Sequence, residues 1–271
     1  MSSVGAVTAI GDWRSILADP GEREHSVQLY TNEGFLTSAV GHYAAVGLRR
    51  GEAIVLVVTP GHHVALVQRL VTDGFDVAQL TDQGQLTILD AAETLSCIMV
   101  DGTPNAEQFM PLIGGVIERA ASRYARVRAY GEMVDLLWQK GELTPALQLE
   151  ELWNDLAKVR PFALHCAYAI DNFDRAAHCC ALHGIHHAHS QLLPVEDYSR
   201  LDIAVNRALS DVLGSTEALV LKSVLIARPQ HGSRMPGAQA AHMGLSEVIP
   251  TALEAVLARA RRYYGTPAGR S

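Results

Sequence analysis

A carboxylate follows a β-like run in the segment Arg126–Trp138, which reads RVRAYGEMVDLLW. The run from Val127 to Tyr130 has the character of a short strand. Gly131 predicts a sharp turn, and Glu132 lies at that turn. Open α/β sheets bind their ligands at the carboxyl ends of their strands. Glu132 is therefore predicted to bind a ligand or act as a base, and the alternative is that it caps the helix that follows.

Four more side chains are predicted to border the same pocket. His25 and Tyr30 bracket the expected first strand, and Tyr168 lies in the expected last one. Histidine and tyrosine can line a small-molecule pocket while presenting polar tips to the ligand. Trp138 follows Glu132 by six residues and is expected either to close one wall or to pack underneath. Core packing is the alternative for each of these side chains.

The segment HCCALHGIHHAH is rich in side chains that bind metals. If residues 176–190 form one helix, one face carries four of them at spacings i, i+4, i+7 and i+8, namely Cys179, His183, His186 and His187. Thiolate and imidazole suit Zn²⁺ or Cu, so a transition metal is the cofactor that the sequence suggests. Gly184 weakens such a helix, and the spacing matches no familiar zinc signature. Histidines at an interface are therefore the alternative.

A phosphate-binding loop is not recognisable after the most apolar run. Such a loop requires GxxxxGK[ST] after a buried strand. The run Ala53–Val58 is instead followed by TPGHHVALV, which has one glycine, no lysine and no hydroxyl at the magnesium position. Gly61, His62 and His63, at the start of a helix, could hold an anion only weakly. The sequence therefore argues against ATP as a cofactor.

These residues depend on a regular alternation of strands and helices between residues 25 and 170. The expected strands are 25–30, 53–58, 86–89, 126–130 and 162–170. The alternation predicts an α/β fold with a mainly parallel central sheet flanked by helices. Residues 104–124 have the clearest helical periodicity, and Pro111 is expected to kink that helix or delay its start.

Three segments are expected along the chain. Residues 1–20 form a lead-in, residues 21–200 the α/β domain, and residues 201–271 a helical C-terminal appendage. With 48% hydrophobic and 19% charged residues, the 271-residue chain can bury a substantial core. The net charge of −7 argues against nucleic acid and anionic membranes as partners.

Compartment and membrane association are also predicted from composition. Four cysteines without a CxxC pair, Cys166 among them, are expected to be reduced thiols in the cytoplasm, and Cys166 itself to be a small buried hydrophobe. The N-terminus lacks the pattern of a signal peptide. No run approaches the roughly 18 apolar residues of a membrane span.

Seven segments taken together resemble a known family. In order they are HSVQLY, GLRRGEAIVLVV, GQLTILDAAET, RVRAYGEMVDLLW, LQLEELWNDL, FALHCAYAIDNF and HSQLLPVEDY. As an ordered set they resemble the methanogen/methylotroph DcmR sensory domain, MEDS, over roughly residues 20–200. The resemblance implies a divergent RecA/KaiC-like core with a degenerate phosphate loop and a role in bacterial signal sensing. It also implies a structural role for His189, which lies in the last segment.

The sequence therefore predicts a cytoplasmic sensor that binds a small ligand and regulates a partner protein without catalysis. The resemblance implies a kinase or a transcription factor as that partner, since family members often carry such domains and this chain shows neither. Three alternatives remain open: a nucleotide- or metal-dependent enzyme on the same core, a Zn or Cu sensor built on the His/Cys cluster, and a scaffold that forms homo-oligomers through residues 200–264.

Overall fold

A six-stranded parallel sheet lies at the centre of the computed structural model, which describes residues 12–175, 177, 181–227 and 235–265. The strand order is β3-β2-β6-β7-β1-β8, and every pairing within this sheet is parallel. The strands are β1 (His25–Tyr30), β2 (Ala53–Val58), β3 (Leu86–Asp90), β6 (Val127–Gly131), β7 (Ala163–Ala169) and β8 (Gln191–Leu192). The predicted α/β class with a mainly parallel sheet is confirmed.

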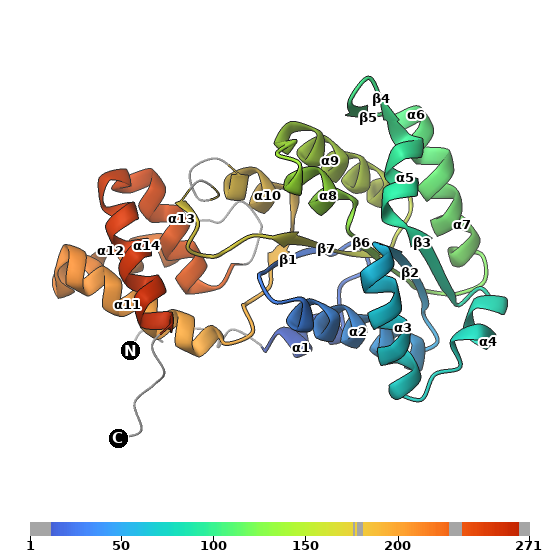
Figure 1. Ribbon diagram of the computed structural model, residues 1–271, viewed down its shortest axis with the longest axis horizontal. Coiled ribbons are helices and arrows are strands. Elements are labelled where there is room, and N and C mark those ends of the chain that lie inside the picture. Colours follow the sequence, from blue (N-terminus) through green and yellow to red (C-terminus); the bar gives the residue numbers. More distant parts are fainter. Residues whose placement is uncertain (1–11, 176, 178–180, 228–234, 266–271) are drawn as a thin grey trace, which may run out of the picture.

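Helices cover both faces of this sheet (Figure 1). One face carries α1 (Trp13–Ala18), α2 (Glu33–Arg49), α3 (Pro60–Thr72) and α4 (Val77–Asp82). The other carries α5 (Ala91–Ile98), α6 (Ala106–Phe109), α7 (Gly115–Ala121), α8 (Met133–Gln139), α9 (Leu143–Val159) and α10 (Leu182–Ala188). A short hairpin follows α5, in which the two-residue strands β4 (Met99–Val100) and β5 (Thr103–Pro104) pair antiparallel.

The apolar runs of the strands follow from burial on both faces. In β2, Val55 and Val57 contribute to the core under α5–α10, whereas Ile54 and Leu56 contribute to the core under α2–α4. Successive side chains of a strand point to opposite faces, so a strand covered on both sides is apolar at every position. The same alternation in β1 directs His25 and Val27 to the α9 side and Tyr30 to the α2 side.

The helix predicted over residues 104–124 contains a π-helical turn at its proline. The chain is α-helical in α6, π-helical over Met110–Gly114 and α-helical again in α7. Proline has no N–H to donate and its ring crowds the preceding turn, so the wider turn accommodates it within one continuous helix. Asn105 caps the start of this helix by accepting a hydrogen bond from the amide of Gln108.

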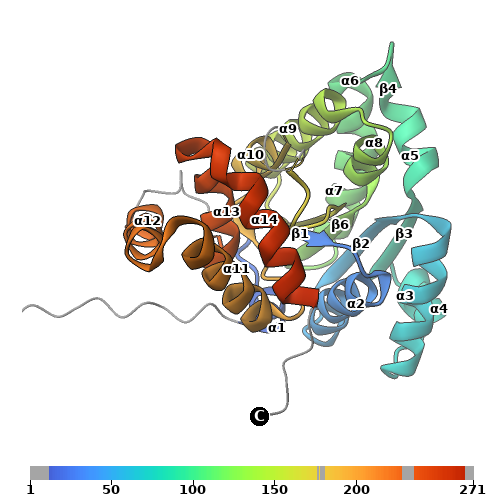
Figure 2. The same ribbon diagram turned by 60° about the vertical axis from the view of Figure 1, so that its left-hand side comes forward.

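Four helices follow the sheet and form a core of their own. They are α11 (Tyr198–Leu213), α12 (Ser215–Ala227), α13 (Gly237–Val248) and α14 (Pro250–Gly265). Figures 1 and 2 show this helical module beside the β1–β8 edge of the sheet. The predicted helical C-terminal region is confirmed. None of the helices in the described ranges is long and apolar enough to cross a bilayer.

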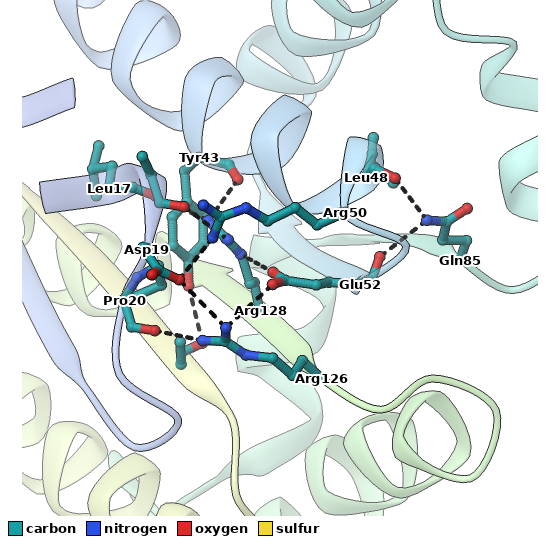
Figure 3. A network of polar contacts seen from close by, with 12 residues as sticks. Leu17, Asp19, Pro20, Tyr43, Leu48, Arg50, Glu52, Gln85, Arg126 and Arg128 are labelled. Atoms are coloured by element: carbon teal, nitrogen blue, oxygen red, sulfur yellow. Dashed lines mark hydrogen bonds and ion pairs between the residues drawn. The ribbon is translucent and has the colours of Figure 1, made fainter. Parts of the chain in front are cut away.

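A buried arginine ties the first helix to the sheet on the α2 side. Arg128 of β6 is 1% exposed, donates through Nε to Glu52 and through its guanidinium to the carbonyl oxygens of Leu17, Ala18 and Tyr43 (Figure 3). Gly47 makes this approach possible, since a Cβ there would lie 2.9 Å from the arginine Cδ. Close packing of α2 on β6 therefore requires glycine at this position.

Candidate functional site

Glu132 lies at the carboxyl edge of the sheet, as predicted, but hydrogen bonds from its own chain surround it. Its side chain is buried, and Oε2 accepts a 2.7 Å hydrogen bond from the amide of Thr59. Oε1 accepts from the Tyr130 hydroxyl at 3.1 Å and lies 2.7 Å from Nδ1 of His62. Glu132 makes no side-chain cap on α8, the helix that it precedes. Its carboxylate instead lies at the N-terminus of α3, where the helix dipole favours a negative charge.

His62 carries the positive charge that balances this carboxylate. Its ring lies between Glu132 and Glu33, with Nε2 against the second carboxylate. The hydrogen bond to Glu132 raises the pKa of His62 to about 9, with Glu33 adding to the effect and partial burial opposing it. The sequence indicated a weak anion site at the start of α3, and the carboxylate of Glu132 occupies that place.

The raised pKa of His62 predicts a loss of stability at alkaline pH. Its pKa is higher in the folded chain than the ordinary value of 6.5, so its contribution to stability is complete below about pH 6.5. That contribution is lost as the pH rises through about 9. We expect the free energy of unfolding, measured with urea between pH 6 and 10, to fall less steeply in His62→Asn than in the wild type. Parallel curves for the two proteins would contradict the raised pKa.

A second buried carboxylate joins three elements at the same edge. Asp135 of α8 accepts 2.8 Å hydrogen bonds from the Tyr30 hydroxyl and from the backbone amide of Ala169. Burial raises the pKa of Asp135 and also that of Tyr30. Trp138 donates its indole N–H to the carbonyl of Ala169 at 3.3 Å and packs edge-on against Tyr168. Trp138 therefore packs underneath this edge, one of the two roles predicted for it.

A cleft of about 200 Å³ opens where β1 and β7 end and the helical module begins. From the sheet side it is lined by Leu29, Tyr30, Thr31, Asn32, Phe35, Asp171, Asn172 and Phe173. From the C-terminal side it is lined by Val195, Glu196, Leu201 and Tyr264. The cleft thus joins the carboxyl ends of two parallel strands to helices α11 and α14, and an open α/β sheet places ligands at such strand ends.

A buried cluster of polar side chains lies on the α9 face, nearer the start of β1. It consists of His25 at the start of β1, Cys166 in β7, Glu150 in α9 and His189 directly after α10. All four are buried, and one ligand atom from each lies within 4.8 Å of the others. The two imidazole rings are 4.0 Å apart. Tyr168 donates a 2.7 Å hydrogen bond to Oε1 of Glu150.

Burial and mutual charge determine the protonation of this cluster. Burial lowers the pKa of His25, and the nearby His189 adds to that effect. Burial also raises the pKa of the Cys166 thiol, and Glu150 adds to that effect. Burial would raise the pKa of Glu150, but the two histidines outweigh it and hold that pKa below its usual range. The predicted burial of Cys166 is confirmed; it belongs to the hydrophobic core on the α9 face, and its sulfur also contacts His25 and Glu150.

The structure describes residues 177 and 181–190 of the His-rich segment, and among these residues 182–188 form a helix. Helix α10 begins at Leu182, and Cys179 lies outside the described residues. His183 and His187 are exposed, with their Nε2 atoms 3.0 Å apart. His186 is buried and packs with its ring 6.1 Å from that of His187. The predicted metal set thus divides into a surface pair, a buried ring and a cysteine that the structure does not describe.

The side chains predicted for one ligand pocket lie in three places. Tyr30 lines the cleft, Glu132 and Trp138 lie in the packed carboxyl edge, and His25 and Tyr168 belong to the buried cluster. Glu150 and Asn154 were not among the predicted site residues, because carboxylates and amides on an amphipathic helix usually face solvent. The i, i+4 spacing of these two residues on α9 was the one signal available.

The chain matches the model of a known family. It is MEDS, the MEthanogen/methylotroph, DcmR Sensory domain, and it covers residues 24–189, which include β1, β7, the buried cluster and the sheet side of the cleft. Comparison with curated proteins finds no match. The family match spans more than half of the chain and agrees with the resemblance seen in the seven ordered segments. The chain therefore belongs to the MEDS family of sensory domains.

Proposed function

We propose that this protein senses a small organic molecule, which binds in the cleft between the MEDS domain and the helical module. The observation that carries the proposal is the composition of the cleft walls. Tyr30 and Phe173 belong to the family-matched part of the chain, whereas Leu201 and Tyr264 belong to helices α11 and α14 beyond it. A ligand that contacts both parts favours one arrangement of them over another, which is how binding becomes a signal.

The lining residues define the kind of ligand. Aliphatic and aromatic side chains, among them Phe35, Phe173 and Tyr264, suit an apolar body. Asp171 already contacts Arg261 and accepts from the amide of Phe173, whereas the carboxylate of Glu196 is an acceptor that suits a ligand with a hydrogen-bond donor. The volume of about 200 Å³ is below the roughly 300–1,000 Å³ of sites for drug-sized molecules. Small organic alcohols and amines meet these conditions.

ATP is not the ligand in this proposal, although we retain the RecA/KaiC-like ancestry that the resemblance implied. The amide of Thr59 and the ring of His62 already bind the Glu132 carboxylate at the N-terminus of α3. A phosphate group there would displace a buried, hydrogen-bonded carboxylate and meet the exposed carboxylate of Glu33 nearby. Both effects oppose the binding of an anion.

The output of the sensor is proposed to pass through the helical module to a regulatory protein in the cytoplasm. Helix α12 exposes Leu219 at 68% and Val220 at 58%, and α11 exposes Ile203 at 69%. Exposed apolar side chains on a module that also borders the cleft are suited to contact with a partner protein. Sensing in this way requires binding and rearrangement but no chemical step.

Binding of small alcohols and amines to the full chain tests the proposal. In ligand-observed NMR with a panel of these molecules, we expect binders whose affinity falls at least about fivefold in Tyr264→Ala, since a lost aromatic contact in the site costs more than about 1 kcal/mol. Hydrogen exchange in α11 and α14 should slow when a binder is added.

The neighbouring tyrosine supplies a matched control. Tyr263 packs on Arg207 and donates to Asp211, away from the cleft lining. Tyr263→Ala should therefore change affinity by less than about twofold, which is under 0.5 kcal/mol. If neither variant changes the affinity of any binder, the ligand site lies elsewhere. If no molecule of the panel binds the wild type, the proposed class of ligand is wrong.

A further inference from the structure

The tautomer of His25 is fixed by the amide beside it. The Nδ2 group of Asn154 donates a 2.8 Å hydrogen bond to the carbonyl of Ala188, so the Oδ1 atom of Asn154 is its free acceptor. That oxygen lies 2.9 Å from Nδ1 of His25. Nδ1 must therefore carry the proton, and Nε2 of the neutral ring has a lone pair. This lone pair points at Sγ of Cys166, 3.3 Å away, and at Oε2 of Glu150, 3.4 Å away.

The tautomer of His189 is fixed in the same way by the backbone. Its Nδ1 lies 2.6 Å from the carbonyl oxygen of Ile185, which can only accept a hydrogen bond. Nδ1 is therefore protonated, and the lone pair of Nε2 points toward Oε1 of Glu150 at 3.3 Å. This Nε2 atom is buried and makes no hydrogen bond. An imidazole held by a backbone carbonyl at one nitrogen is the usual arrangement of a histidine that binds a metal through the other.

The cluster thus directs two nitrogen lone pairs, a carboxylate and a sulfur at one point. The hydroxyl of Tyr168 donates to Oε1 of Glu150. Apart from that, the only proton that these inward-facing groups can share is that of the Cys166 thiol, which cannot serve Glu150 and both imidazoles together. Electron pairs that face each other in a buried site repel strongly, so a cation bound between these groups would stabilise the site.

Four separations within the cluster fall in the range of tetrahedral coordination. Bonds of about 2.0–2.3 Å to nitrogen, oxygen and sulfur place neighbouring ligand atoms of a tetrahedral zinc site about 3.3–3.7 Å apart. The separations are 3.3 Å from Cys166 Sγ to His25 Nε2 and 3.6 Å from Sγ to Oε2 of Glu150. Oε2 lies 3.4 Å from Nε2 of His25, and the other carboxylate oxygen, Oε1, lies 3.3 Å from Nε2 of His189. All four ligand atoms lie within 4.8 Å of one another, so one metal ion could contact all four groups once they adjust toward it.

We propose that His25, Glu150, Cys166 and His189 bind one Zn²⁺ ion in a closed structural site. Two imidazoles, one thiolate and one carboxylate are ligands that zinc accepts, and four protein ligands leave no open position for catalysis. The groups behind the ligands also suit a metal. Asn154 and the carbonyl of Ile185 orient the imidazoles, and Tyr168 hydrogen-bonds the carboxylate.

Such an ion joins parts of the chain that are distant in sequence. It holds the start of β1 to β7, to α9 and to the segment between α10 and β8. Strand β1 runs on from His25 to Tyr30, which lines the cleft, so the ion anchors one end of a strand whose other end borders the proposed ligand site. The zinc site does not depend on the cleft binding a ligand.

Refolding of the full chain tests this site. The protein is unfolded in guanidinium chloride with a chelator, then refolded with Zn²⁺, with Co²⁺ or without metal. We expect one zinc ion per chain by elemental analysis, and a melting temperature about 5 °C or more above that of the metal-free protein. The cobalt form should absorb through a thiolate-to-metal charge-transfer band together with tetrahedral ligand-field bands.

Variants distinguish this site from the surface histidines. Cys166→Ser and His189→Asn should lose the bound zinc, and Cys166→Ser should lose the charge-transfer band, whereas His183→Ala/His187→Ala should keep both. If the double variant loses its zinc while Cys166→Ser keeps it, the proposal is overturned and the surface pair is the zinc site. A wild-type chain that binds no zinc and shows no cobalt–thiolate band would also overturn it, whether or not the variants fold.

Discussion

Replacing Arg128 by methionine is expected to cost about 3–5 kcal/mol of folding free energy, because it leaves the buried carboxylate of Glu52 without its main partner. The arginine uses Nε for Glu52 and its other nitrogens for the carbonyl oxygens of Leu17, Ala18 and Tyr43 (Figure 3). Methionine fills much of the volume but donates no hydrogen bond, so those acceptors also lose their donors. Urea unfolding measures the loss, and the melting temperature should fall by roughly 10 °C.

The neighbouring arginine provides the control. Arg126 also contacts Glu52 and Asp19, but its side chain is 33% exposed. Arg126→Met should therefore cost less than about 1 kcal/mol, as partly exposed ion pairs usually do. Arg128→Met/Glu52→Met removes both charges and should be more stable than Arg128→Met alone. A single Arg128→Met variant with wild-type stability would mean that this network does not hold α1 to the sheet.

Replacing Glu132 by alanine is expected to destabilise the fold by about 2–4 kcal/mol. The substitution removes the acceptor of the buried Thr59 amide and of the Tyr130 hydroxyl, and each unsatisfied buried donor costs about 1–3 kcal/mol. It also removes the main partner of protonated His62. Chemical denaturation of the variant at pH 7 measures the effect, and the pH dependence of its stability should flatten as the pKa of His62 returns toward 6.5.

Glu33 is the matched carboxylate for this experiment. It contacts the opposite nitrogen of the same histidine, but its side chain is 70% exposed. Glu33→Ala should cost no more than about 1 kcal/mol, since the solvated ion pair is weak. Equal losses of folding free energy in Glu33→Ala and Glu132→Ala would show that the burial of Glu132 does not strengthen its interactions. A Glu132→Ala variant as stable as the wild type, with weakened binding of a cleft ligand, would support the ligand-binding role predicted from sequence.

The sequence by itself determined the elements of the fold. The run AIVLVV predicted a strand covered on both faces, and β2 is buried at every position. Asn32 and Asn105 stand directly before helices, where a short side chain that accepts backbone hydrogen bonds is favoured, and both accept such bonds. These predictions succeed because capping and side-chain alternation act over a few neighbouring residues.

Local signals were less reliable where a neighbour in space changes the role of a residue. Gly131 was expected to form a sharp turn, yet it is the last residue of β6 and pairs with β2 and β7. Glu132 was expected either to reach a ligand or to cap its own helix; its side chain makes no cap on that helix and accepts from Thr59 across the sheet edge. Neither interaction is encoded in the segment RVRAYGEM, because both partners lie on other strands and loops.

Only the tertiary structure assembled the buried cluster. His25, Glu150, Cys166 and His189 are spread over more than 160 residues, and each has an ordinary explanation by itself: a strand end, a helix surface, a hydrophobic thiol, a structural imidazole. The parallel pairing of β1 with β7 brings His25 near Cys166, and the packing of α9 and α10 adds Glu150 and His189. Metal ligation and burial of charge depend on distances of a few ångströms between such side chains, and sequence spacing determines those distances only within one helix or strand.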